Sequence, residues 1–336
     1  MKLKLLLGAI LFMFSYCVCG QLLDINSKYR GEPFFMSVDM YQLQQDCARN
    51  EDEYNQLDKK EKIKYDSRCP LNNLKFDFKQ LDKLIDDDPI VYNGNDFQLK
   101  LSISPINPKN QNEEDLPNLG RDITLSLISK NQVIDKLFLA NNSFSNNPNL
   151  WNGYQHYYIA PSGDIYTLLS IKSEPIEDES GTFPTLWKHY NIDTSNMKFV
   201  LKEMQINMPE ATYHIIYPNQ FNIKFHEGAV EYGLTLEESI AFFEQSSKDG
   251  SSDYSLATRV YRYYQDQLKE KVNQLDNKKQ QQDSFTALKQ NISKMCLATP
   301  APIHESDIEL YLHKVLTCLI EQDRQAIQHA EDELGS

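Results

Sequence analysis

The fold follows from residues 154–171, which read YQHYYIAPSGDIYTLLSI. Aromatic and β-branched residues dominate both ends of this stretch, and such residues favour β-strands. Between them, residues 161–164 (Pro-Ser-Gly-Asp) place a proline and a glycine where a tight turn accepts them. The stretch therefore predicts two strands, residues 154–160 and 165–171, joined as an antiparallel hairpin.

The flanking sequence repeats a two-residue period. Leu99, Leu101 and Ile103 alternate with polar residues, as in a strand that buries one face. Sequential hairpins of this kind build an antiparallel β-meander, which we place at residues 91–205. An acidic loop is expected at residues 174–185. The further strands are expected at residues 97–103, 123–127, 133–139, 187–192 and 197–201, of which the last two form the final hairpin.

Residues 21–90 are expected to form an N-terminal helical hairpin. Met40, Leu43 and Cys47 recur at a spacing of three to four residues and share one face of a helix. A second helix is expected at residues 74–85, because its apolar residues repeat with the same period.

Residues 206–334 are expected to form a C-terminal helical bundle. Thr235 and Glu238 fit a capping box, in which two side chains satisfy backbone donors at the start of a helix. Three amphipathic stripes follow, at residues 256–275, 285–295 and 312–320. The chain as a whole is therefore predicted to be α+β.

Residues 1–20 fit a cleavable export signal. Lys2 and Lys4 precede an apolar run, and Val18 and Gly20 are small enough for a signal-peptidase site before Gln21. The apolar run is too short to cross a bilayer comfortably. We therefore expect a periplasmic or secreted protein with no stable membrane insertion after signal removal.

Four cysteines remain after the signal. An even number of cysteines in an oxidising compartment indicates disulfides, and three connectivities are possible. We favour Cys47–Cys69 and Cys296–Cys318, because each pair flanks a plausible helix-turn-helix. A metal site is not expected, because CxxC pairs and clustered histidines are missing.

The charge restricts the partners. The chain has 48 acidic and 34 basic residues and a formal charge of −14, and loss of Lys2 and Lys4 makes the mature chain still more negative. Nucleic-acid binding needs a basic footprint, which this sequence does not show. A basic protein is the natural electrostatic partner, although an acidic balance also serves solubility alone.

Two groups of residues are candidates for a binding site. The first is an aromatic and imidazole face, formed by His156, Tyr158 and His189 if their strands pair suitably. Ordinary cross-strand packing is the competing interpretation. The second is an acidic cluster on predicted loops, which would dock a cationic partner or, if two carboxylates converge, cleave a glycan. Its members are Asp164, Glu174, Glu177, Asp178 and Glu179.

No catalytic or cofactor motif stands out. The sequence lacks a GxSxG nucleophile elbow, and His226 with Glu227 lacks the second histidine of a zinc-protease motif, since Val230 occupies that position. We therefore expect an exported, non-enzymatic binding protein that captures a basic partner, such as an immunity protein or an inhibitor of a cell-wall lytic enzyme or toxin. The alternatives are an envelope glycan hydrolase with paired carboxylates and a structural envelope protein.

Overall fold

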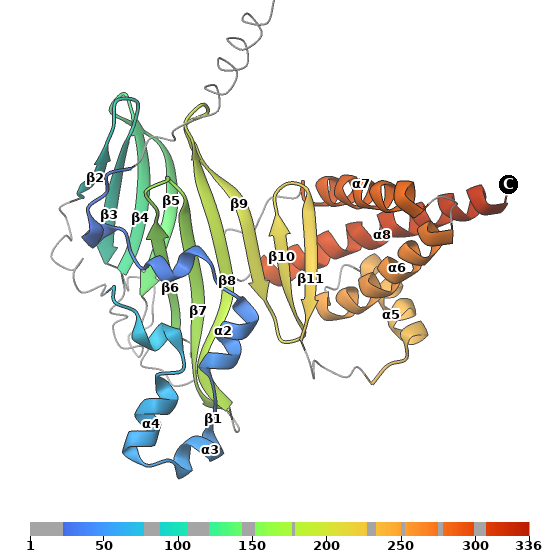
Figure 1. The fold of residues 1–336 in the computed structure, drawn as a ribbon, viewed down its shortest axis with the longest axis horizontal. Coiled ribbons are helices and arrows are strands. Elements are labelled where there is room, and N and C mark those ends of the chain that lie inside the picture. Colours follow the sequence, from blue (N-terminus) through green and yellow to red (C-terminus); the bar gives the residue numbers. More distant parts are fainter. Residues whose placement is uncertain are drawn as a thin grey trace, which may run out of the picture. The chain divides into compact units, whose positions relative to one another are not determined.

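The computed structural model describes residues 23–76, 88–105, 121–142, 152–176, 179–226, 233–249, 253–274, 278–298 and 307–335. The predicted export signal, residues 1–20, lies outside them, as does most of the helix predicted at residues 74–85. Within these ranges the α+β prediction is confirmed: short helices come first, an antiparallel meander follows, and long helices end the chain (Figure 1).

The chain divides into two compact units. Unit 1 comprises residues 1–38, 47–182 and 189–200, and unit 2 comprises residues 39–46, 183–188 and 201–336. Two strands, β8 (Glu179–Asp193) and β9 (Lys198–Asn207), contribute residues to both units. The boundaries predicted at residues 90 and 205 stay predictions.

Unit 1 is built on the predicted meander. Its strands lie in the order β7-β6-β5-β4-β3-β2 and pair antiparallel with their sequence neighbours (Figure 1). Because side chains alternate between the two faces of a strand, every second residue of β3 and β4 points into the core. These six residues are all buried and lie opposite one another in pairs: Leu99 and Leu127, Leu101 and Leu125, Ile103 and Ile123. The strands are β2 (Ile90–Asn93), β3 (Gln98–Pro105), β4 (Arg121–Ser129), β5 (Gln132–Asn142), β6 (Asn152–Ile159) and β7 (Ile165–Ile176).

Two turns of the meander match their sequence chemistry. Lys130 and Asn131 join β4 to β5 with φ values of 52° and 60°, the left-handed conformation that a two-residue hairpin turn requires. Gly163 joins β6 to β7 with φ 90°, a conformation that costs glycine little. The predicted hairpin of residues 154–171 is therefore confirmed.

The N-terminal segment completes the edge of β6. β6 pairs with β5 through Tyr154 and Gln155, whereas further along it Arg30 accepts a hydrogen bond from the Ile159 amide and Glu32 donates one to the Tyr157 carbonyl. Gly31 lies against Tyr157 so closely that an added Cβ would come within 2.0 Å of the Tyr157 carbonyl oxygen. The same N-terminal segment contains two short 3₁₀ helices, η1 (Ser27–Tyr29) and η2 (Pro33–Met36).

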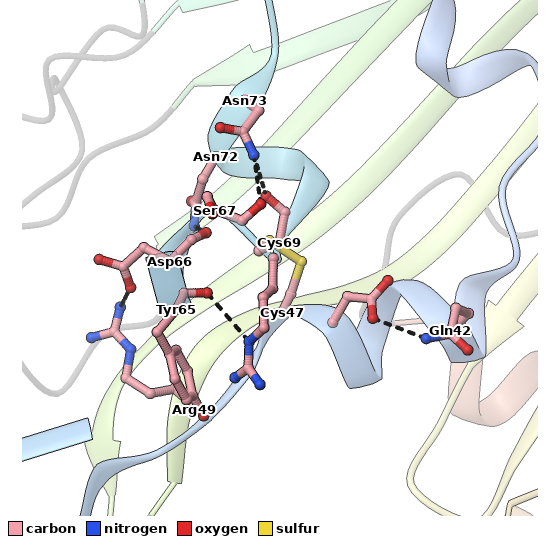
Figure 2. Close-up of a disulfide and its surroundings, with 11 residues drawn as sticks. Gln42, Cys47, Arg49, Tyr65, Asp66, Ser67, Cys69, Asn72 and Asn73 are labelled. Atoms are coloured by element: carbon pink, nitrogen blue, oxygen red, sulfur yellow. Dashed lines mark hydrogen bonds and ion pairs between the residues drawn. A yellow bond between two sulfur atoms is a disulfide. The ribbon is translucent and has the colours of Figure 1, made fainter. Parts of the chain in front are cut away.

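The disulfide Cys47–Cys69 ties together the small helical part of unit 1, as predicted (Figure 2). Beside it, Asp66 accepts hydrogen bonds from the Arg49 guanidinium at 3.1 Å and from the Tyr54 hydroxyl at 2.9 Å. This part comprises β1 (Ala48–Asn50), α3 (Glu51–Gln56), α4 (Lys59–Asp66) and η3 (Pro70–Asn73), and β1 pairs with β8.

Unit 2 joins strands to long helices, and the second predicted disulfide, Cys296–Cys318, is also present. In Figure 1 the helix α8 (Ile308–Gly335) runs beside α6 (Tyr254–Gln274), and α7 (Lys278–Cys296) contacts both α8 and β11 (Gln220–Phe225). The predicted capping box is confirmed, since the Thr235 amide donates to Glu238 and the Glu238 amide to Thr235. The elements are α2 (Met40–Cys47), β10 (Ala211–Ile216), β11 (Gln220–Phe225), α5 (Leu236–Asp249), α6 (Tyr254–Gln274), α7 (Lys278–Cys296) and α8 (Ile308–Gly335).

Two local predictions are wrong. The acidic loop predicted at residues 174–185 is largely strand, because β7 continues to Ile176 and β8 begins at Glu179. The hairpin of residues 187–201 is not the last one, since β10 and β11 form another. Five of the six residues of β10, Ala211 to Ile215, are buried or half-buried on both faces, so the alternation that marks a half-buried strand is missing there.

The two disulfides indicate an extracellular or periplasmic protein, because such bonds persist in oxidising compartments. No described helix is long and apolar enough to cross a membrane.

Candidate functional site

The structure brings two of the predicted site residues together in unit 1. Asp164 lies in the turn between β6 and β7, and His189 lies on β8. The Nε2 atom of His189 is 3.0 Å from Oδ1 of Asp164, and the imidazole stacks on the Tyr166 ring with centroids 4.6 Å apart. The Ser162 hydroxyl donates to the second carboxylate oxygen of Asp164 at 2.6 Å.

Asp164 stays ionised at neutral pH. Burial alone would raise the pKa of its carboxyl, but hydrogen bonds from Ser162, His189 and Asn191 outweigh burial and lower the pKa below its ordinary value. The side chains of Asp164 and His189 are 26% and 20% exposed, so solvent and a partner reach both. The turn thus presents a fixed carboxylate at the surface of unit 1.

The order of these three side chains argues against serine-nucleophile chemistry. In a hydrolytic triad the histidine lies between serine and carboxylate, so that it takes the serine proton. Here the carboxylate of Asp164 lies between Ser162 and His189, and the serine proton points to the carboxylate. The arrangement holds a negative charge in place and does not activate a hydroxyl group.

His156 and Tyr158 lie on β6 and share a face of the sheet, as expected from their spacing. That face is covered at His156, which stacks on the fully buried Phe35 of η2 with ring centroids 5.4 Å apart. Burial lowers the pKa of His156 to about 4. Tyr158 is 7% exposed. Tyr158 therefore offers little area to a partner, and His156 is half-buried against Phe35.

The acidic cluster is described in part. Glu174 lies on β7 and Glu179 is the first residue of β8, so these two belong to strands rather than to a loop. Glu177 and Asp178 lie outside the described residues. Their role as a docking rim stays a prediction.

Sequence reasoning missed a buried ion pair in unit 2. The Lys289 ammonium on α7 lies 3.0 and 3.1 Å from the two carboxylate oxygens of Asp323 on α8 and 3.3 Å from the Tyr261 hydroxyl. Asp323 is fully buried. Burial lowers the pKa of Lys289 and raises that of Asp323, while the mutual attraction of the two charges opposes both shifts.

The signal for this pair was present in the helical period. Asp323 follows Leu316 and Leu319 at spacings of seven and four residues, and Lys289 lies four residues after Phe285 and three before Ile292. Both charges thus occupy apolar stripes. A single charged residue within an apolar stripe is expected either to reach solvent or to have a partner. Two residues of opposite charge on the apolar stripes of neighbouring helices therefore predict an ion pair.

A second polar cluster in unit 2 surrounds His226. Its Nδ1 faces the Pro209 carbonyl oxygen at 3.1 Å, and its Nε2 lies 2.8 Å from the Thr212 hydroxyl. That hydroxyl donates to the Asn207 side-chain carbonyl at 2.8 Å, and the Asn207 amide group donates to Gln44 and to the Pro184 carbonyl.

This chain of hydrogen bonds is one proton short when His226 is neutral. The Pro209 carbonyl only accepts, so the Nδ1 atom of His226 carries a proton. Thr212 has one hydroxyl proton but faces two acceptors, Asn207 and the Nε2 atom of His226. Burial and nearby Lys224 nevertheless keep the pKa of His226 below its ordinary value, against the pull of the Pro209 carbonyl.

No metal centre emerges from the part of the chain that the structure describes, where no three histidine, cysteine or acidic side chains gather as a metal would need. His226 is engaged on both ring nitrogens, and Glu227 lies outside the described residues. No protein-family model, no curated protein and no solved structure matches this chain.

Proposed function

We propose that this chain is an exported, non-enzymatic binding protein that captures a basic protein partner. The partner class is a cell-wall lytic enzyme or a toxin, which the chain would inhibit or neutralise. The observation that carries the proposal is the charge: 48 acidic against 34 basic residues give the chain a formal charge of −14. A negative field of this kind speeds the encounter with a cationic protein and disfavours anionic ones.

The geometry at the β6–β7 turn supports the proposal. Asp164 is held as a carboxylate by Ser162 and His189, and it is partly exposed. A carboxylate whose hydrogen bonds fix its position loses little freedom when it meets a lysine or arginine of a partner. The same hydrogen bonds occupy Asp164 with Ser162 and His189 rather than with a second acid, which is unfavourable for glycosidase chemistry.

Two disulfides support a binding role as well. Each closes a segment of 22 positions, and rigid segments bind at a lower entropic cost than mobile ones.

The test is a capture assay with the mature chain immobilised and basic muramidases and basic bacterial toxins as probes. Raising the salt from about 0.1 M to about 1 M shortens the Debye length from about 10 Å to about 3 Å. We expect a retained probe at low salt, slower association at high salt and inhibition of the probe's lytic activity in solution. Retention of no basic probe at low salt would overturn the proposal.

Neutralising variants localise the docking surface. The test variant removes four charges isosterically near the β7–β8 connection: Glu174→Gln, Glu177→Gln, Asp178→Asn and Glu179→Gln. The control removes four exposed charges from the helices of unit 2: Glu237→Gln, Glu309→Gln, Glu321→Gln and Asp332→Asn. Both variants change the net charge by the same amount. If residues 174–179 form the docking rim, the test variant associates with the basic probe roughly tenfold more slowly, and the control variant associates at the rate of the parent chain.

A further inference from the structure

Unit 2 contains an open groove with unusual walls. It has a volume of about 320 Å³ and lies between the start of β11, the middle of α6 and residues 285–293 of α7. Small-molecule pockets have volumes of about 300–1,000 Å³ and are lined mainly by apolar side chains. Five carboxamides line this one instead: Asn219, Gln220, Asn222, Gln265 and Gln290.

The floor of the groove is fixed and its rim is open. Phe221 and Ser293 line it and are buried, so packing sets their positions. Asn222 on β11 and Gln290 on α7 are exposed, and their amide groups are free to meet a ligand from two sides. Contacts between α7 and β11 hold the two walls together.

The groove has little net charge. Its one described charged lining residue is Lys289, whose ammonium is matched by the buried carboxylate of Asp323 at 3.0 Å. An anionic ligand would therefore meet no uncompensated positive charge, and a cationic ligand no carboxylate on the lining. An apolar ligand would bury the amide groups without hydrogen bonds, which costs free energy.

From these walls we propose that the groove binds a short segment of a neutral oligosaccharide. Each carboxamide offers two donors and one acceptor oxygen, and each sugar hydroxyl both donates and accepts, so the two match without any charge. Phe285, which is half-buried on the lining, supplies an aromatic contact on which the C–H face of a sugar ring packs. This site is built from residues of unit 2, whereas the residues proposed to dock a basic protein belong to unit 1, and neither proposal depends on the other.

The test uses isothermal titration of the full mature chain with three probes of similar size. These are a neutral tetrasaccharide panel (N-acetylglucosamine, maltose-type and cellulose-type), a sulfated tetrasaccharide, and an uncharged tetrapeptide blocked at both ends. We expect at least one neutral tetrasaccharide to bind at about 1 mM or below, and the other two probes to bind at least tenfold more weakly. Tighter binding of the sulfated sugar or of the peptide, or no binding of any neutral sugar, overturns the proposal.

Two exposed variants place the binding in the groove. Asn222→Ala and Gln290→Ala each remove one amide group and are expected to weaken sugar binding by about three- to tenfold. Gln245→Ala removes another exposed helical glutamine, on α5 and outside the groove lining, and is expected to leave the affinity unchanged. Sugar binding that both groove variants leave unchanged would contradict the assignment, and circular dichroism shows that each variant is folded.

Discussion

Lys289→Met is expected to lower the free energy of unfolding of unit 2 by about 3–5 kcal/mol. Methionine keeps the length and flexibility of the lysine chain but removes the ammonium that lies 3.0 Å from Asp323. Asp323 is 0% exposed, so its carboxylate is left without a counter-charge and without solvent. The cost is that of an unpaired buried charge, which exceeds the net stabilisation that the pair itself contributes.

Asp323→Leu is expected to cost less, about 1–3 kcal/mol. The cost is smaller because Lys289 is less buried than Asp323. The Lys289 side chain is 16% exposed and lines the groove, so its ammonium can turn towards water when Asp323 is removed. The double variant Lys289→Met, Asp323→Leu replaces both charges by apolar groups of similar size. It is expected to lie within about 1 kcal/mol of the parent chain, since buried ion pairs are often replaceable by well-packed apolar residues.

The measurement is urea unfolding of the four proteins, with the disulfides intact, followed by the helical circular-dichroism signal. The long helices α5 to α8 all belong to unit 2, so this signal reports on it. The three differences define a double-mutant cycle, and we expect a coupling of at least about 3 kcal/mol. Additive costs in the double variant, or a cost below about 1 kcal/mol for Lys289→Met, would refute the reasoning.

Three further predictions concern stability. The double substitution of Cys296 and Cys318 by serine is expected to cost about 3 kcal/mol for a closed segment of 22 positions, seen as a melting temperature below that of the parent chain under oxidising conditions. Under reducing conditions, which open both disulfides of the parent and the remaining one of the variant, the two proteins should melt alike. His156 has a pKa of about 4 when folded and about 6.5 when unfolded, so the unfolded chain binds more protons between these values. Stability should fall as the pH drops from 6.5 towards 4, by up to about 3 kcal/mol, and a His156→Phe variant that shows the same loss would contradict this cause. Gly31 has a φ of 78°, and an added Cβ there would clash with the Tyr157 backbone, so Gly31→Ala is expected to lower the free energy of unfolding by about 2–4 kcal/mol. At Gly233 an added Cβ would meet nothing within 4 Å, so Gly233→Ala should be near neutral in the same unfolding assay.

The parts of the fold that the sequence predicts are those with a clear local period. Leu99, Leu101 and Ile103 alternate, and the strand they predict is β3. Thr235 and Glu238 predict a helix start, and the reciprocal hydrogen bonds are present. The cysteine pairing also followed from local context, because each pair flanks a plausible helix-turn-helix, and both disulfides are present.

The remaining features depend on contacts between distant segments. β10 is buried on both faces, so its residues show no alternation to read. In unit 1 the contact between Asp164 and His189 joins residues 25 positions apart, which a local period does not reveal, and Tyr158 is buried. The pair of Lys289 and Asp323 joins residues 34 positions apart, and only their place on apolar stripes hinted at it.

The N-terminal segment has a consequence for how the protein matures. The Tyr157 hydroxyl donates to the Tyr29 carbonyl across 128 positions, and the Leu23 amide donates to the Pro161 carbonyl. A polypeptide leaves the ribosome, or a translocation pore, with its first residues ahead, so residues 23–32 wait without their binding strand until β6 has emerged. During that interval Leu23 and Ile25, buried in the finished protein, are exposed to water. Unit 1 should therefore be most prone to aggregation early in its biogenesis, and a holding chaperone would have its natural target there.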